Sequence, residues 1–335
     1  MNAPAVTLAD VAREAGTSAS TASRALSGRG YVAPHVRKRL LAVADRLGYV
    51  PNLSARTLKQ RTSRVVGVVV SELGNQFYAA LAAGVEQTLR EANYQMLLLG
   101  DNSDVAQELK GVRTFISMRA PGVIMTPVSN SAADLLVARG MPVVEADRRL
   151  ATSSCDAVVI DNERGAHDVV AHLLGLGHTR VGLLVARTTW TTDAGRLDGY
   201  RSAHAAAGLR VDRKLVVKIA THATDASPRI GALLDEERPT AIFAANNLLA
   251  EQAWLAMRER KLSIPGDISL VAFDDVPWME MVQPGITAVA QPTFEMGRRA
   301  ALLLLRRLED PSCGRTIEVL EPRLVLRGSC GPPAT

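Results

Sequence analysis

From residue 65 onward, short aliphatic runs alternate with amphipathic segments, and this alternation constrains the fold more than any other feature of the chain. The segments near 77–92, 104–118 and 130–139 have the spacing of helices. Apolar strands separated by helices predict a parallel sheet covered on both faces. The first four expected strands are Val65–Val70, Tyr94–Leu99, Gly122–Met125 and Pro142–Glu145.

The same pattern then repeats, which predicts a second α/β unit. A long helix over Phe294–Leu308 and a final strand near Glu318–Leu326 follow it, and they indicate that the chain returns to the first unit. The strands of the second unit are expected at Val158–Ile160, Val181–Val185, Leu215–Ile219, Ala241–Ala244 and Ser269–Phe273.

Polar residues follow several of these strands, where ligands of parallel sheets bind. Carboxylates, amides and an arginine beside aromatic faces suit a polyhydroxylated ligand. The same asparagines and aspartates also suit helix caps, Asp275 suits a structural role, and Trp278 suits a core or an interface. The polar groups are Ser71 to Tyr78, Asp147-Arg148, Asp161-Asn162, Asn246-Asn247 and Asp274-Asp275, with Arg196 at the start of a helix.

The first 64 residues differ from the rest in charge. They hold 11 Lys and Arg against 3 Asp and Glu, whereas the other 271 residues hold 28 against 31. A short basic head on a faintly acidic body is typical of a nucleic-acid-binding module joined to another domain. Because a solvated basic surface has the same charge, the head needs a motif to support this interpretation.

A helix-turn-helix supplies that motif. Thr7 and Asp10 form a capping box, Gly16 ends the first helix, and Ser18 is expected to cap a second helix over Ala19–Leu26. A third helix is expected to begin at Pro34, a favoured first position. The short turn predicts that the second helix enters a major groove, where hydroxyls suit phosphates and an arginine suits guanine.

A basic segment with a single exposed aliphatic residue, Leu58, follows the three helices. Asn52 suits the cap of a helix too short and too polar to fold alone in water. One interpretation is a flexible basic linker. The other is a hinge helix that folds only on DNA and inserts Leu58 between minor-groove base steps.

The segment VTLADVAREAGTSASTASRALSGRGYVAPHVRKRLLAVADRLGYVPNLSARTLKQRTSRVVGVVV resembles the head, hinge and first strand of the lac repressor (LacI/GalR) family. The later motifs extend this resemblance over essentially the whole chain. It implies an N-terminal all-α helix-turn-helix head with a hinge helix. An α/β two-lobed, periplasmic-binding-protein-like domain follows, with parallel sheets and three crossovers. The expected parts are a head at 1–50, a hinge at 51–64, a first lobe at 65–161 plus 291–324, and a second lobe at 162–290 plus 325–335.

The resemblance also implies roles for single residues. Ala19, Ser20 and Arg24 match base-reading positions, Ala55 a contact between two hinges, and Leu58 the minor-groove wedge. The full set of expected DNA contacts is Thr7, Ser18, Ala19, Ser20, Thr21, Ser23, Arg24, Asn52, Ala55, Leu58 and Lys59. The expected effector contacts are Asn75, Phe77, Asp147, Trp190, Thr192, Arg196, His222, Asn246, Asp274 and Trp278.

Four positions depart from the family pattern. Thr17 and Ala22 stand where larger aliphatic residues are usual, Ala33 replaces a serine cap, and Asn247 replaces an aspartate.

The sequence therefore predicts a cytoplasmic, homodimeric transcription regulator whose affinity for a pseudo-palindromic operator responds to a sugar, polyol or sugar acid. Induction and corepression both stay open, as do a nucleobase or protein corepressor and a solute-binding protein without DNA function. We expect no catalytic residues, cofactor, metal or membrane partner. No nucleophile motif or phosphate loop is present, His167 and His172 do not share a helix face, and the three cysteines form no pair motif.

Overall fold

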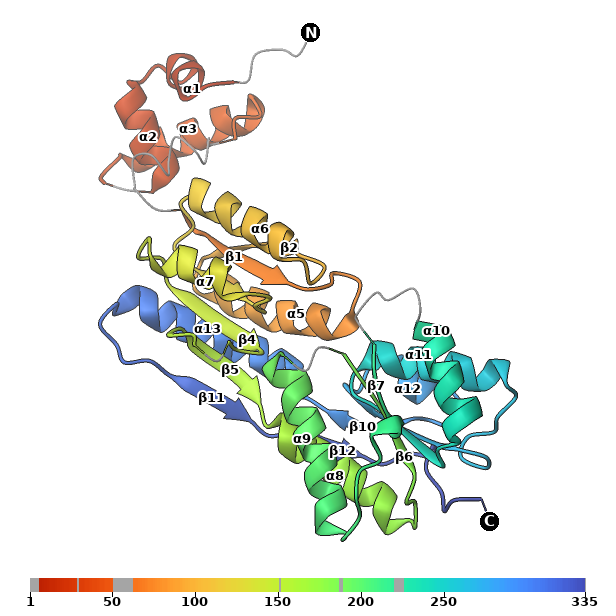
Figure 1. The fold of residues 1–335 in the computed structure, drawn as a ribbon. Helices are drawn as coiled ribbons and strands as arrows, with labels where there is room; N and C mark the ends of the chain where they lie inside the picture. Colours follow the sequence, from red (N-terminus) through yellow and green to blue (C-terminus); the bar gives the residue numbers. More distant parts are fainter. Residues whose placement is uncertain are drawn as a thin grey trace. The chain divides into compact units, whose positions relative to one another are not determined.

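The computed structural model describes residues 6–28, 30–50, 63–150, 152–186, 189–219 and 226–334. The chain divides into two compact units, Met1–Ser63 and Arg64–Thr335. Figure 1 gives the element labels that are used below. No helix in the described ranges combines the length and the apolar character needed to cross a bilayer.

The first unit is a three-helix head. Its helices are α1 (Leu8–Glu14), α2 (Ala19–Ser27) and α3 (Pro34–Arg46), and they pack around a small core. The predicted helix starts are confirmed. Thr7 and Asp10 form the reciprocal capping box, the Ser18 hydroxyl accepts from the Thr21 amide, and Pro34 opens α3.

A parallel six-stranded sheet forms the first lobe of the second unit, in the order β11-β5-β4-β3-β1-β2. Helices α5 (Gln76–Glu91) and α13 (Thr293–Glu309) cover one face, and α6 (Val105–Ser117) and α7 (Asn130–Val137) cover the other. The strands are β1 (Val65–Val70), β2 (Gln95–Gly100), β3 (Val123–Met125), β4 (Val143–Asp147), β5 (Asp156–Ile160) and β11 (Ile317–Leu320).

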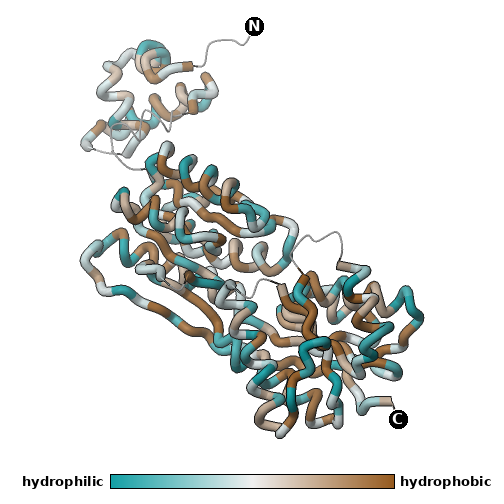
Figure 2. The backbone as a smooth tube through the Cα atoms, in the orientation of Figure 1, coloured by the Kyte–Doolittle hydropathy of each residue, from teal (hydrophilic) through white to brown (hydrophobic). Residues whose placement is uncertain are grey.

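The second lobe repeats this plan with the strand order β12-β10-β9-β8-β6-β7. Helices α8 (Asn162–Gly175) and α9 (Thr191–Ala206) cover one face, and α10 (Ala226–Ala232) and α11 (Asn247–Glu259) cover the other. The strands of both lobes are largely hydrophobic (Figure 2). They are β6 (Val181–Val185), β7 (Val216–Lys218), β8 (Ala241–Ala244), β9 (Ser269–Phe273), β10 (Thr287–Ala290) and β12 (Arg323–Val325), with the short helix α12 (Trp278–Met281) after β9.

The described chain passes between the two sheets three times. The first passage leads from β5 to α8, the second from β10 to α13, and the third from β11 to β12. The predicted architecture of two α/β lobes with three crossovers is therefore confirmed.

Three strand predictions need correction. The strand at Val158–Ile160 was expected in the second unit, but it is part of β5 in the first sheet, because the chain crosses to the second lobe only after Ile160. The expected final strand near Glu318–Leu326 is two strands, because Pro322 lacks the amide hydrogen that a continuous ladder needs. Of these, β11 completes the first sheet, whereas β12 pairs antiparallel with β10, so the second sheet is not wholly parallel. Strand β10 was not expected, because Thr-Ala-Val-Ala is only four residues long and two of them are alanines, which are depleted in strands.

Helices α5 and α13 approach so closely that two glycines are required at their crossing. A Cβ atom on Gly84 would lie 2.0 Å from the Phe294 carbonyl oxygen, and one on Gly297 would lie 2.0 Å from the Leu81 carbonyl oxygen. Each glycine thus faces the backbone of the other helix. Since α13 follows β10 of the second lobe, this crossing ties the returning chain to the first lobe.

Gly84→Ala should destabilise the second unit by about 1–3 kcal/mol, because the added methyl group can be accommodated only by moving helix backbone. Urea unfolding followed by circular dichroism measures the change. Gly175→Ala is the matched control: Gly175 is also helical, and its Cβ would meet nothing within 4 Å. It should be neutral or slightly stabilising, and equal losses from both variants would contradict the close crossing.

Candidate functional site

Helix α2 presents a small polar face to solvent. Ser18, Ala19, Ser20 and Arg24 are exposed, while Thr21 and Ser23 are half-buried. The opposite face is anchored by Ala22 and Ala25 in the head core. Short side chains let a helix approach a groove closely, and the Arg24 guanidinium supplies paired donors at the end of this face.

The turn before α2 is tight. Gly16 has φ +60°, and the Thr17 amide donates to the Ala12 carbonyl at 2.9 Å. Thr7, at the start of α1, is also exposed. The remaining predicted DNA contacts, Asn52, Ala55, Leu58 and Lys59, lie outside the described residues.

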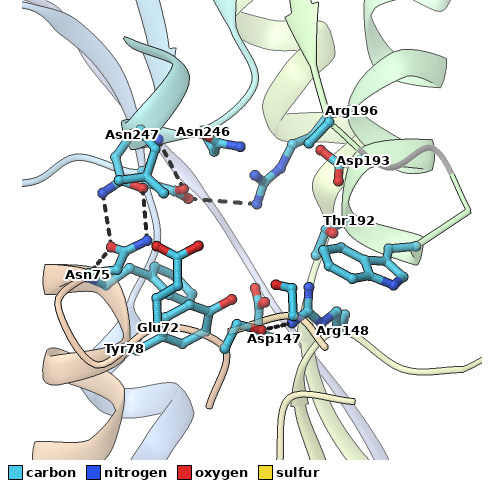
Figure 3. A pocket seen from close by; sticks show the side chains of 17 residues that line it. Glu72, Asn75, Tyr78, Asp147, Arg148, Thr192, Asp193, Arg196, Asn246 and Asn247 are labelled. Atoms are coloured by element: carbon cyan, nitrogen blue, oxygen red, sulfur yellow. Dashed lines mark hydrogen bonds and ion pairs between the residues drawn. The ribbon is translucent and has the colours of Figure 1, made fainter. Parts of the chain in front are cut away.

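A cavity lies between the two lobes of the second unit, with about 520 Å³ of empty space including its open mouth. Its walls come from the carboxyl ends of β1, β2, β4, β6, β8 and β9 and the segments that follow them, so the carboxyl ends of both sheets meet there (Figure 3). The lining residues are Ser71, Glu72, Asn75, Phe77, Tyr78, Ser103, Asp147, Arg148, Ala186, Trp190, Thr192, Asp193, Arg196, Asn246, Asn247, Leu248 and Asp274.

Helix caps hold several of these residues in place. The Asn75 side chain accepts from the Phe77 amide at 3.0 Å at the start of α5, and Asn246 accepts from the Leu249 amide at 2.8 Å at the start of α11. Asp161 caps α8 in the same way. In each Asp-Asn or Asn-Asn pair the first residue is the cap, which leaves Asn162 and Asn247 for other contacts.

Arg196 is the most heavily bonded cation of the cavity. Its Nε donates to the Asn162 side-chain Oδ1 at 2.8 Å, one terminal nitrogen donates to the Ala245 backbone carbonyl at 2.6 Å, and the other lies 3.6 Å from Asp274. The guanidinium also stacks on Phe273 at 3.8 Å. Five donors in a planar fork suit this arrangement, and they fix the Arg196 side chain on the second-lobe side of the cavity.

Arg148 reaches across to the second lobe. Its guanidinium lies 3.8 Å from the centre of the Trp190 ring, while its terminal nitrogen donates to Ser71 of its own lobe. Its Nε is buried and has no hydrogen-bond partner among the described residues. A cation on an aromatic face in a dry site is a favourable contact between the lobes.

Asp147 and Asp274 occupy similar places, since Asp147 ends β4 and Asp274 directly follows β9, the third strand in the order of each sheet. Both have a left-handed backbone, with φ +68° and +70°. Asp274 contacts Arg196, Gln291 and the Asn247 amide, whereas no described residue donates a hydrogen bond to the Asp147 carboxylate. Burial raises the pKa of Asp147 to about 6, although Arg148 and Arg196 oppose the shift.

Comparison with known proteins decides the family. The chain matches the family description "Bacterial regulatory proteins, lacI family" over residues 7–52 and "Periplasmic binding protein-like domain" over residues 170–330. It is 31% identical over 331 residues to the HTH-type transcriptional regulator DegA of Bacillus subtilis, covering 97% of this chain and 98% of that protein. The chain belongs to the LacI family.

Two further similarities extend over nearly the whole LacI-family chain. The ribose operon repressor of Haemophilus influenzae is 28% identical, with 96% of this chain and 98% of that protein covered. A transcriptional regulator CelR–cellobiose complex is 29% identical with a TM-score of 0.73, covering 97% of this chain and 100% of that chain. The chain is thus a DNA-binding transcriptional regulator of this family.

Eight of the ten effector contacts predicted for this LacI-family regulator line the one cavity: Asn75, Phe77, Asp147, Trp190, Thr192, Arg196, Asn246 and Asp274. Trp278 does not line it; its ring lies 6.3 Å from that of Trp254 and packs against the core of the second lobe. His222 lies outside the described residues. Asp275 holds Arg327 through two hydrogen bonds, which is the structural role that the sequence left open.

Several lining residues were not predicted as contacts, among them Arg148, Asp193 and Asn247. Arg148 directly follows the predicted Asp147, and Asn247 directly follows the predicted Asn246, both near strand ends. A prediction that included the next residue at each strand end would have found them. Asp193 lies in the first turn of α9, between the predicted Thr192 and Arg196. Asp193 lies three positions before Arg196, and this spacing places both residues on one face of a helix. That signal was available in the sequence.

The contrast between the two aspartates predicts opposite effects on stability. The folded protein holds a proton on Asp147 up to about pH 6, whereas the unfolded chain releases it near the ordinary pKa of 3.8. Stability from this group therefore falls as the pH rises from 4 to 6. Asp147→Asn should stabilise the protein at pH 8 by about 1–2 kcal/mol and have little effect at pH 4.

Asp274→Asn is the matched variant. It removes the charge that faces buried Arg196 and should destabilise the protein at pH 8 by about 1–3 kcal/mol. Urea unfolding of both variants at pH 4 and pH 8 measures the difference. A loss of stability from Asp147→Asn at pH 8 would show that its carboxylate has a donor after all.

Proposed function

We propose that this regulator binds a sugar, polyol or sugar acid between its lobes, and that the ligand sets its affinity for a pseudo-palindromic operator. The observation that carries the proposal is the buried Asp147 carboxylate. It lines the cavity, and no described residue donates a hydrogen bond to it. Its oxygens are not among the fully buried unpartnered atoms, so they are open to the cavity, where a ligand hydroxyl can donate to them.

The rest of the lining suits the same ligand class. Thr192 and Asn246 offer hydrogen-bonding groups from the second lobe, and Phe77 and Trp190 offer apolar surface for the C–H groups of a sugar ring. Alternating polar and apolar contacts match a ring with hydroxyls on its rim. Two of the similar proteins fit this class, because one is named a ribose operon repressor and one structure is a complex with cellobiose, whereas other relatives are named PurR repressors.

A nucleobase fits these contacts less well. Arg148 covers one face of the Trp190 ring at 3.8 Å, so a single face of this ring remains for either a base or a sugar ring. The cavity lining also contains four carboxylates, Glu72, Asp147, Asp193 and Asp274, which accept from hydroxyl groups readily. We therefore favour the polyhydroxylated ligand.

On the DNA side, the proposal places α2 in a major groove, with one head on each half-site of a homodimer. The exposed hydroxyls of Ser18 and Ser20 suit phosphate oxygens, and Arg24 suits the paired acceptors of guanine. Two heads related by a two-fold axis read two inverted half-sites, which is why the operator is expected to be pseudo-palindromic.

The ligand proposal predicts a coupled response. A panel of pentoses, hexoses, disaccharides, polyols and sugar acids is first screened by thermal shift. A ligand at about 100 times its Kd stabilises the protein by about 2.7 kcal/mol. The same compound should change operator affinity in a fluorescence-anisotropy titration, because both readouts depend on one cavity. Arg196→Ala should abolish both responses and leave operator binding intact.

A panel in which no compound shifts the melting temperature would contradict the sugar class. A compound that shifts the melting temperature of the parent and of Arg196→Ala equally would show that it binds elsewhere.

The DNA proposal predicts that Arg24→Ala reduces discrimination between operator and unrelated duplex by about 1–3 kcal/mol per half-site. Arg46→Ala is the control, because Arg46 lies at the end of α3 and pairs with Glu14 at 2.8 Å. That control should leave the affinity ratio unchanged. Operator and unrelated duplexes are compared at one salt concentration, and an unaltered ratio for Arg24→Ala would remove this residue from base reading.

A further inference from the structure

The two lobes touch directly at the cavity through a pair of lining asparagines. Asn75 belongs to the first lobe and Asn247 to the second, 172 positions apart in sequence. The Asn247 side-chain nitrogen donates to the Asn75 oxygen at 2.9 Å, and the Asn75 nitrogen donates back to the Asn247 oxygen at 3.4 Å. Figure 3 shows the two amides facing each other.

Both amides are buried, since Asn75 is 9% and Asn247 is 5% exposed. A carboxamide carries one donor group and one acceptor on the same plane, so two of them pair reciprocally without a third molecule. Burial shields the pair from competing water, which strengthens each hydrogen bond.

Rigid elements hold both partners. The Asn75 oxygen also accepts from the Phe77 amide and so caps α5, while the Asn247 backbone amide lies 3.4 Å from Asp274 at the start of α11. The two amides are therefore fixed to the first turns of helices in opposite lobes. Any rotation that separates the lobes on this side must break the pair.

We propose that Asn75 and Asn247 form an interlobe latch that holds the lobes closed through protein atoms alone. The latch assigns Asn75 a role different from the ligand contact expected from the sequence. Its two polar side-chain atoms are both engaged by the latch and the α5 cap, so Asn75 and Asn247 are positioning residues. Recognition of the ligand is left to the other lining residues, such as Asp147.

The latch has a consequence for regulation that does not depend on the identity of the ligand. Two lobe arrangements that differ in operator affinity are populated according to their free energies, and breaking a contact found only in the closed arrangement shifts the population. Loss of the latch therefore changes operator affinity without any effector. The direction of the change tells whether the closed arrangement binds or releases DNA.

Asn247→Asp tests the latch with nearly no change in shape. An aspartate accepts from Asn75 but has no hydrogen to donate to the Asn75 oxygen, and its charge lies beside Asp274. Asn130→Asp is the matched control. Asn130 is the first residue of α7, as Asn247 is of α11, and it is exposed, so it receives the same charge at a helix N-terminus without crossing lobes.

Acrylamide quenching of Trp190 fluorescence reports lobe closure, because Arg148 of the first lobe covers this second-lobe ring. The full-length protein carries Trp254→Phe and Trp278→Phe, so that Trp190 is the sole source of the signal. We expect the quenching constant to rise at least twofold in Asn247→Asp and to stay unchanged in Asn130→Asp. Operator affinity should change at least threefold in the first variant alone.

Asn247→Ser and Asn130→Ser repeat the test without an added charge, and circular dichroism melts confirm that each variant is folded. If Asn247→Asp does not fold, the serine pair decides. Unchanged quenching in the folded Asn247 variants, or an equal rise in the Asn130 controls, overturns the latch. The quenching measurement contains no sugar. A protein that fails to respond to sugars would therefore contradict the proposed ligand class and leave the latch proposal unaffected.

Discussion

Parallel pairing forces the strands of a sheet to end at a common edge, and the cavity of this protein depends on that constraint. In each lobe the residues that follow the strands gather at the carboxyl edge, where backbone groups and helix starts are free to hold polar side chains. The three passages of the chain bring the two edges together. Asp147 and Asp274 thereby line one cavity, although each belongs to its own sheet.

The two arginines that line the cavity differ in how fully their donors are partnered. On the second-lobe side, Arg196 binds Asn162, the Ala245 carbonyl and Asp274. On the first-lobe side, the buried Nε of Arg148 lacks a hydrogen-bond partner among the described residues. Arg196 is thus a preformed support, whereas Arg148 keeps an unpartnered donor.

The sequence predicted the strands with long aliphatic runs and the helices with clear caps, because these signals are local. It missed β10, because four residues that include two alanines carry little local signal. It also joined β11 and β12 into one strand, because the proline between them interrupts a run that otherwise looks continuous. Site residues that follow strands were predictable from position alone. The pairing of Asn75 with Asn247 was not, because no local pattern reports a contact between residues 172 positions apart. Likewise, the sequence of two adjacent asparagines did not reveal which of them caps the helix.

The route of the chain sets an order for biosynthesis. The head consists of consecutive residues, so it can fold soon after it leaves the ribosome. Neither lobe is built that way. The first sheet lacks β11 and the cover of α13 until the chain has grown past residue 320, and the second sheet lacks β12 until a few residues later. Newly made protein therefore carries a finished DNA-binding module ahead of two incomplete sheets with uncovered apolar edges, a state in which chaperone protection matters most.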